Sequence, residues 1–182
     1  MEGKENANQR DNPMKAIRIN KLVVNIGTGN DDKKQANAKK LLELITGASP
    51  SDAISKKRIP SFKISVGAKI GAFVTLRNKA AYDTAKRLFE AVDNKLSEKN
   101  VEANTVNFGI KEYIDISGVK YDPTIGMMGM NIDVSFKRPG LRTELRKRAR
   151  AKVKRLHRQI GREELKEYLG KEFGIKIEGA SQ

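Results

Sequence analysis

Residues 70–77, IGAFVTLR, form the stretch that decides the fold, because apolar and other side chains alternate along it without interruption. Successive side chains of a β-strand point to opposite faces of the sheet. One face of this strand is therefore apolar, and the other carries Phe73, Thr75 and Arg77. A strand of this kind is typical of an antiparallel sheet that packs on a core with one face and leaves the other open.

The strand pattern recurs on both sides of this stretch. Further strands are predicted, in chain order, at residues 17–26, 62–66, 106–116, 130–136 and 175–177. The first changes parity near Lys21, which predicts a β-bulge. The alternation in 130–136 places Asn131 and Ser135 on the polar side.

Helices are predicted between the strands. Apolar residues at helical spacing indicate helices at residues 32–46, 79–96 and 163–173, and Gly47 ends the first. Residues 141–158 are predicted to form a very basic helix. The whole pattern predicts an α+β fold, with a mainly antiparallel sheet, helices on one face and an open polar face.

The domain organisation is predicted to be simple, because no internal repeat or Pro-rich linker divides the chain. A single domain covers residues 14–178 and includes a basic insert at residues 137–161. A flexible lead-in, residues 1–13, precedes it, and a short tail, residues 179–182, follows it.

The charge of the chain predicts a polyanionic partner. Thirty-seven Lys and Arg against 22 acids give a formal charge of +15, whereas a small soluble domain needs only about 2–8 charges of either sign. Nucleic acid is the first candidate and an anionic membrane surface the second. No apolar run approaches the ~18 residues that span a bilayer, and residues 1–10 lack the apolar core of a signal peptide. We therefore expect a cytoplasmic protein.

Catalytic chemistry has little support in the sequence. Cysteine is absent and His157 is the only histidine, so neither a metal cluster nor a catalytic triad can be assembled. Gly27-Thr28-Gly29 resembles a phosphate loop, but a third glycine is missing and Asp31 and Asp32 follow it. We predict a tight turn with an acidic helix cap, no cofactor, no metal and no enzymatic activity; a phosphate-handling enzyme remains an alternative.

Cationic side chains are concentrated in and beside the basic insert. Residues 137–162 hold twelve Lys or Arg against one acid, Glu144. A solvated helix face normally mixes both signs of charge, so this excess predicts contact with phosphate groups. The cations of the insert that we predict to bind RNA are Lys137, Arg138, Arg142, Arg146, Lys147, Arg148, Arg150, Lys152, Lys154, Arg155 and Arg158.

The polar side of the predicted sheet is the second candidate interface. Asn, Ser and Thr side chains on a flat surface can hydrogen-bond to RNA sugars and phosphates and so fix the register of binding. The side chains predicted to bind RNA on this face are Asn25, Lys63, Ser65, Thr75 and Arg77.

Several ordered blocks carry a resemblance to a known family. The blocks are NPM (12–14), KLVVNIGTG (21–29), LLELITGASP (41–50), FKISVGAKIGAFVTLR (62–77) and NFGIKEYIDISGVKYDPTIGMMGMNIDV (107–134). They resemble the universal large-subunit ribosomal protein five, the family that binds 5S rRNA. The basic insert resembles the archaeal and eukaryotic branch of that family.

The resemblance implies a structural protein of the cytoplasmic large ribosomal subunit that joins 5S rRNA to the large rRNA in the central protuberance. Asn25 and Thr75 match family contacts to 5S rRNA, whereas Ala48 stands where the family often has a glutamine. The implied protein partners are a neighbouring 5S-binding ribosomal protein and a small-subunit head protein at an intersubunit bridge. A loop carrying Lys56, Lys57, Arg58, Lys63 and Lys69 would reach P-site tRNA. A general DNA or chromatin protein is the alternative that charge alone would allow.

Overall fold

A computed structural model describes residues 12–178, which form an α+β fold around one six-stranded antiparallel sheet. In sheet order the strands are β2 (Ser51–Ile54), β3 (Lys69–Leu76), β1 (Arg18–Gly27), β7 (Met130–Lys137), β6 (Thr105–Ile110) and β5 (Val101–Glu102). The predicted tail, and the predicted lead-in apart from Asn12 and Pro13, lie outside the described residues.

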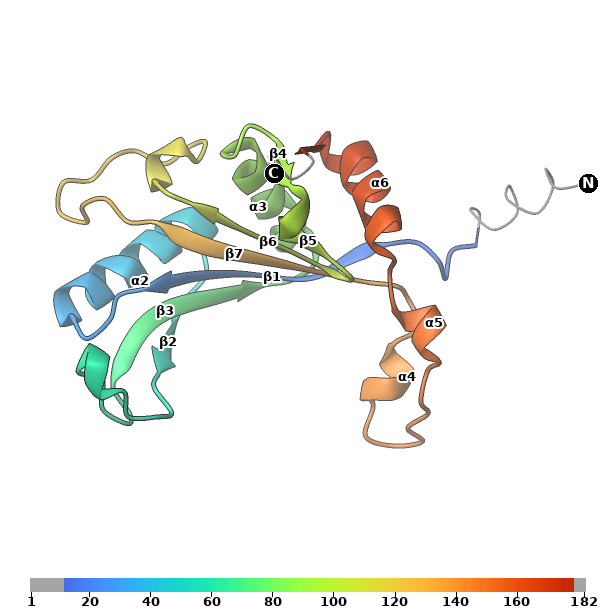
Figure 1. The fold of residues 1–182 in the computed structure, drawn as a ribbon, viewed down its shortest axis with the longest axis horizontal. Coiled ribbons are helices and arrows are strands. Elements are labelled where there is room, and N and C mark those ends of the chain that lie inside the picture. The colour runs from blue at the N-terminus through green and yellow to red at the C-terminus, as the bar shows by residue number, and fades with distance from the viewer. Residues whose placement is uncertain (1–11, 179–182) are drawn as a thin grey trace, which may run out of the picture.

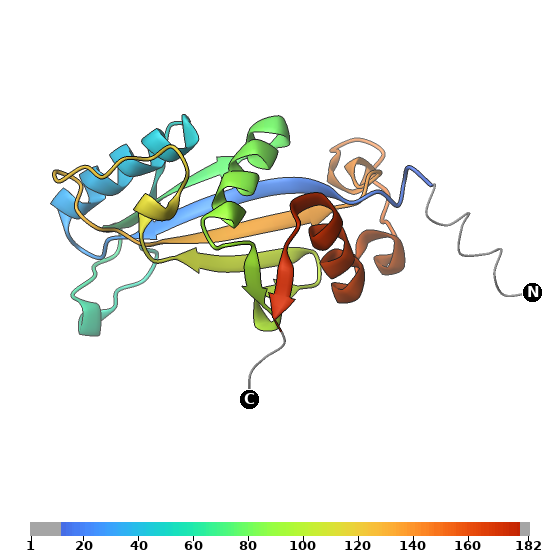
Figure 2. The same ribbon diagram turned by 90° about the horizontal axis from the view of Figure 1, so that it is seen from above.

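Three helices cover one face of the sheet (Figures 1 and 2). They are α2 (Asp32–Thr46), α3 (Asn78–Glu90) and α6 (Arg162–Phe173). Their apolar stripes pack on the inward side chains of the strands, so that Leu41, Leu88 and Leu165 are fully buried. Burial of apolar area drives this arrangement. The predicted fold class, with helices on one face, is confirmed.

A small two-stranded parallel sheet, β4 (Lys95–Ser97) with β8 (Lys176–Glu178), lies beside the helices. The remaining elements are short: η1 (Pro60–Phe62), η2 (Glu98–Asn100), η3 (Tyr113–Asp115), α4 (Arg142–Leu145) and α5 (Arg155–Arg158). No helix within residues 12–178 is long and apolar enough to cross a membrane.

The central strands follow the predicted register. Leu22 of β1 pairs with Leu76 of β3 on one side and with Val134 of β7 on the other, all on the buried face. The predicted bulge is present, because the β1–β7 register shifts between Ile19 and Lys21. The strands that carry Asn25 and Thr75 are therefore fixed by hydrogen bonds along both edges.

Helix α3 is shorter than predicted. The helix expected to reach residue 96 ends at Glu90, because Asp93 and Asn94 adopt left-handed backbone angles, with φ of 54° at both. This turn redirects the chain into β4, where Leu96 is buried. The predicted extended stretch 106–116 likewise ends early, since β6 stops at Ile110 and η3 follows.

The long basic helix predicted at residues 141–158 is wrong. Only α4 and α5 are helical there, and the chain between them is irregular. Like charges spaced three or four residues apart destabilise a helix, and no apolar stripe compensates, because Leu145 and Leu156 are 80% and 84% exposed. The insert is instead a mostly irregular loop that projects from the end of the sheet (Figure 1).

Candidate nucleic-acid interface

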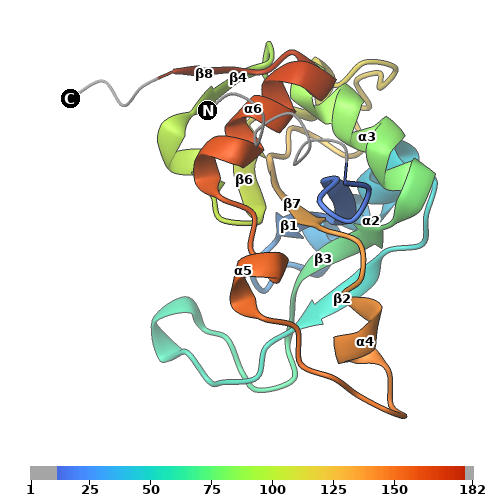
Figure 3. The same ribbon diagram turned by 90° about the vertical axis from the view of Figure 1, so that its right-hand side faces the viewer.

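The sheet face opposite the helices, here called the open face, is not covered by any described element along its centre (Figure 1). Two segments project from this side at its two ends, the loop at residues 55–68 and the basic insert at residues 137–161 (Figure 3). The outward side chains of the open face include Lys21, Asn25, Ser51, Phe73, Thr75, Thr105, Asn107, Asn131, Asp133 and Ser135. The open polar face that the sequence predicts is therefore present.

Asn25 and Thr75 lie near the middle of the open face. Asn25 on β1 pairs with Phe73 of β3 and with Asn131 of β7, which places an aromatic ring and a second amide beside it. Thr75 is exposed on β3, next to Val23 of β1. Because the backbones are held in a regular ladder, these polar groups are presented in fixed positions.

Two of the side chains assigned to this face are elsewhere. Lys63 and Ser65 lie in the 55–68 loop, so the predicted strand at residues 62–66 is wrong. The left-handed backbone of Lys63, with φ of 55°, is incompatible with a strand. Residues of β2 take the edge position beside β3 instead. Arg77 lies one residue beyond β3, at the start of α3, and is exposed.

One part of the open face was not assigned from the sequence. Thr105 and Asn107 of β6 pair with Ser135 and Asp133 of β7, and so extend the polar surface toward the sheet edge. The sequence of residues 105–110 could have indicated this part of the face, because its buried residues, which include Val106 and Phe108, alternate with the outward Thr105 and Asn107.

The 55–68 loop is closed by hydrogen bonds at its base and near its tip. At the base, the Ser55 N–H donates to the Ala68 carbonyl at 2.9 Å and the Ser55 carbonyl accepts from Gly67 N–H at 2.9 Å. Near the tip, Ile59 and Ile64 exchange two backbone hydrogen bonds of 2.9 and 3.1 Å. The loop is therefore a braced projection, although its side chains are exposed.

Side chains at the loop tip combine positive charge with apolar surface. Phe62 is 71% exposed and Val66 is 67% exposed. The four loop cations Lys56, Lys57, Arg58 and Lys63 are exposed, and Lys69 begins β3 at the base. The structure thus brings four of the five predicted tRNA-reaching residues into one projection, with the fifth, Lys69, at its base.

A buried polar network ties the loop base to helix α2. Gln35, which is 5% exposed, accepts from Thr28 Oγ1 at 2.7 Å and donates through Nε2 to Asp52 Oδ1 and to the Gly71 carbonyl, both at 2.8 Å. Lys39 forms an ion pair with Asp52 at 2.6 Å. The hydrogen bond from Lys39 is the main cause that lowers the pKa of Asp52, so the carboxylate is ionised at neutral pH.

The basic insert is organised around its one acid. The Glu144 carboxylate is only 19% exposed and accepts from Arg158 Nη1 at 3.1 Å. Its backbone carbonyl accepts from Arg150 Nε at 2.7 Å, and Arg146 Nε donates to the Ala149 carbonyl at 2.8 Å. These contacts fold the insert back on itself while most of its cationic side chains stay exposed.

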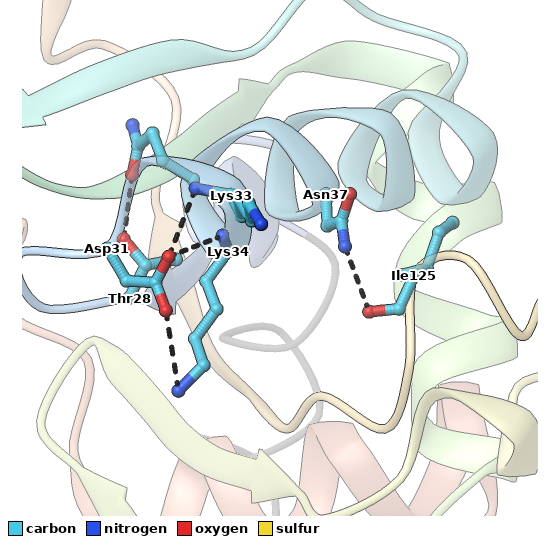
Figure 4. A network of polar contacts seen from close by, with 7 residues as sticks. Thr28, Asp31, Lys33, Lys34, Asn37 and Ile125 are labelled. Carbon is cyan, nitrogen blue, oxygen red and sulfur yellow. Dashed lines mark hydrogen bonds and ion pairs between the residues drawn. The ribbon is translucent and has the colours of Figure 1, made fainter.

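The glycine turn at residues 27–29 is not a phosphate loop. Asp31 caps helix α2, because its Oδ1 accepts from the backbone N–H groups of Lys33 at 3.1 Å and Lys34 at 3.3 Å (Figure 4). A carboxylate therefore occupies the position where a phosphate would bind. A further contact in Figure 4, from Asn37 to the Ile125 carbonyl at 3.3 Å, fastens the helix to the β6–β7 connection. The predicted acidic cap is confirmed.

Residues 12–178 also contain no group of three or more acidic, histidine or cysteine side chains placed to hold a metal ion. The open face offers hydrogen-bonding groups from a polar sheet, and the two flanking projections offer cations for ion pairs.

Two protein-family models match the chain. One, described as ribosomal protein L5, matches residues 12–64, and the other, which describes the C-terminus of the same ribosomal family, matches residues 69–163. The chain is also similar to archaeal proteins named large ribosomal subunit protein uL5. That of Pyrobaculum aerophilum is 41% identical over 170 residues, or 93% of this chain and 94% of the relative.

Two further archaeal relatives carry the same name. The protein of Sulfurisphaera tokodaii is 37% identical over 170 residues, which cover 93% of this chain and 96% of the relative. The protein of Nanoarchaeum equitans is 39% identical over 168 residues, which cover 92% of this chain and 99% of the relative. The similarity therefore extends over nearly the full length of each relative and includes the basic insert.

Proposed function

The chain belongs to the ribosomal protein L5 family and is a structural constituent of the large ribosomal subunit, and we propose that in this particle it binds 5S rRNA through its open face. The family predicted from the sequence is thereby confirmed. A structural ribosomal protein is not an enzyme, so the alternative of a phosphate-handling enzyme is excluded.

The observation that carries the proposal is the open polar sheet between two cationic projections. A-form RNA displays 2′-hydroxyls and phosphates across a wide, shallow minor groove, which a flat set of amide and hydroxyl groups can contact. Asn25 and Thr75 stand at the centre of this surface on strands fixed along both edges. Their polar groups can therefore distinguish one folded RNA from another by shape.

The basic insert supplies a different kind of contact. Its chain is mostly irregular, and residues 137–161 hold eleven Lys and Arg against a single acid. Such a segment neutralises phosphates regardless of sequence. We assign it to the large rRNA, so that 5S rRNA on the open face and large rRNA on the insert are joined through one protein.

The 55–68 loop is the part of the chain that we assign to P-site tRNA. Its braced base fixes the direction of the projection, and its tip presents Phe62 and cations that suit an RNA surface. A photo-crosslinking residue in place of Phe62, tested in assembled subunits with P-site tRNA, should label the tRNA. A crosslinker in place of the exposed Leu44 on helix α2 is the matched control and should not.

Two protein contacts complete the proposal: a neighbouring 5S-binding ribosomal protein and a small-subunit head protein at an intersubunit bridge. Both derive from the family resemblance, and no particular surface of the chain is assigned to them.

Competition binding tests the central claim. The full-length protein is titrated at physiological salt against 5S rRNA, an unrelated structured RNA of equal length, and duplex DNA. We expect tightest binding to 5S rRNA, because only that RNA would match the fixed polar groups of the open face. A preference for duplex DNA would instead support a general DNA-binding protein. Equal binding to both RNAs would contradict the proposal that the open face selects 5S rRNA.

A further inference from the structure

Asn104 holds both ends of the basic insert. It lies in the short connection between β5 and β6, outside the insert and outside every segment assigned above. Its backbone carbonyl accepts from the Phe136 N–H at 2.8 Å, where the chain is about to leave the sheet. Its side-chain Oδ1 accepts from the Ile160 N–H at 2.6 Å, where the chain returns. One residue thus closes the base of the basic insert.

The two points that Asn104 joins are anchored in the core. Phe136 is 2% exposed and Ile160 is fully buried, so neither can shift without loss of packing. Asn104 itself has a left-handed backbone, with φ of 67°, which asparagine tolerates better than most side chains. This backbone directs its carbonyl to one strand end and its amide oxygen to the other.

A cleft of about 310 Å³ lies directly beside this closure. It is lined by Ala103, Asn104, Arg155, Arg158 and Gln159. Each of the two guanidinium groups is held by one side-chain contact, because Arg155 Nε donates to Gln159 Oε1 at 2.9 Å and Arg158 Nη1 donates to Glu144 Oε1 at 3.1 Å. Each guanidinium has five N–H donors, so most remain available to a ligand in the cleft.

We infer that Asn104 is a positioning residue for RNA binding, which fixes the base of the insert so that Arg155 and Arg158 hold one backbone phosphate of RNA in this cleft. Paired guanidinium groups with several free donors match the oxygens of a phosphate. The insert has little regular structure of its own. The placement of these arginines therefore depends on where the chain returns to the sheet. The inference rests on the proposed RNA-binding function.

Two substitutions separate the two roles of Asn104. Asn104→Gly keeps a residue that readily adopts the left-handed backbone but removes the oxygen that accepts from Ile160. Asn104→Asp keeps that oxygen. The matched control is Asn94→Gly, because Asn94 also has a left-handed backbone, with φ of 54°, but lies in the turn before β4 on the helix side.

The readout is the slope of log affinity for large-subunit rRNA, the RNA assigned to the insert, against log salt, measured on the full-length chain together with thermal unfolding. Asn104→Gly should lower the steepness of this slope by about 0.7–0.9, the equivalent of one lost phosphate contact. Asn94→Gly should keep the wild-type slope. Asn104→Asp keeps the accepting oxygen but adds a negative charge to the cleft, so it should keep the wild-type unfolding temperature while weakening RNA binding. In an Arg155→Gln, Arg158→Gln background, Asn104→Gly should cause no further change, because the groups that it positions are already absent.

Several results would overturn the inference while leaving the proposed function intact. One is a wild-type salt slope in Asn104→Gly. Another is a further decrease of the slope when Asn104→Gly is added to Arg155→Gln and Arg158→Gln. The third is global unfolding of Asn104→Gly. If sodium phosphate binds the chain only when Asn104 is intact, yet weakens RNA binding no more than sodium chloride does at equal ionic strength, the cleft binds free phosphate rather than RNA. A wild-type chain that does not prefer 5S rRNA would instead contradict the proposed function itself.

Discussion

The open face and the basic insert offer different kinds of contact to the RNA that we propose they bind. The open face is a regular sheet surface, its central strands are hydrogen-bonded on both edges, and its outward side chains include both Lys21 and Asp133. The insert is mostly irregular and exposed, and its charged side chains are all cationic except Glu144. We therefore propose that selectivity and electrostatic affinity for RNA reside in separate parts of the chain, because fixed dipoles can discriminate shape whereas clustered charge attracts any polyanion.

The largest expected effect comes from charge removal in the insert. The side chains of Lys147, Arg148, Lys152 and Lys154 make no hydrogen bond or ion pair within residues 12–178, so changing all four to Gln removes charge without breaking the insert's internal contacts. At about 0.7–0.9 per phosphate, the salt slope should fall by about 2.8–3.6 and affinity at about 0.15 M salt by roughly two to three orders of magnitude for every RNA.

The control for this variant carries the same charge change elsewhere. Four exposed lysines outside the insert, Lys33, Lys86, Lys99 and Lys120, are changed to Gln. Filter binding over a salt series should show a slope change below about one unit for the control. Equal losses in the two variants would mean that net charge, rather than its concentration in the insert, determines affinity.

A smaller but selective effect is expected on the open face. Asn25→Ala and Thr75→Val each remove one polar partner, which should weaken 5S rRNA binding by about 1–3 kcal/mol, or roughly 5- to 150-fold. Binding to an unrelated RNA should be unchanged, and Asn100→Ala, in η2 away from this face, should leave both affinities as they are. Parallel losses for both RNAs would contradict the assignment of selectivity to the sheet.

The sequence predicted the open face well because its signals are local. The alternation in residues 70–77 depends only on which side chains a strand must bury, and β3, β1 and β7 follow it within one residue at most positions. The first helix was also predicted correctly, since Asp31 and Gly47 mark its two ends by their own backbone and side-chain chemistry. Such features do not depend on the rest of the chain.

The predictions that were wrong concern segments whose conformation depends on contacts with residues far away in the sequence. Residues 62–66 alternate like a strand, but β2 occupies the sheet edge that they would need, and this cannot be read from their own pattern. The insert has helical spacing, yet its ends are set by Asn104, which lies more than thirty residues before Phe136. Lys63 and Ser65 were therefore placed on the wrong surface.

A single neutralisation within the insert should have a modest and uniform effect. Arg148→Gln should lower the salt slope by about 0.7–0.9 and weaken all RNAs by the same factor, because one phosphate contact is lost. The measurement is the same salt series with 5S rRNA and an unrelated RNA. A loss of affinity confined to 5S rRNA would show that the insert also recognises a particular RNA structure. Selectivity and electrostatic affinity would then not reside in separate parts of the chain.

The smallest effect is expected for the stability of the free protein when a leucine is removed from the insert. Leu156 is 84% exposed, whereas Leu42 of helix α2 is fully buried. Leu156→Ala should therefore change the free energy of unfolding by no more than about 0.5 kcal/mol. Leu42→Ala should cost about 2–5 kcal/mol, because it leaves a cavity in the core.

Denaturant unfolding of the two leucine variants measures how independent the insert is from the domain that carries it. If Leu156→Ala destabilised the protein by about 2 kcal/mol or more, the insert would have to pack against the core in solution, and its cations would be held at fixed positions like the polar groups of the sheet. Selectivity could then no longer be attributed to the open face alone, because a rigid array of charges can also match one RNA shape better than another.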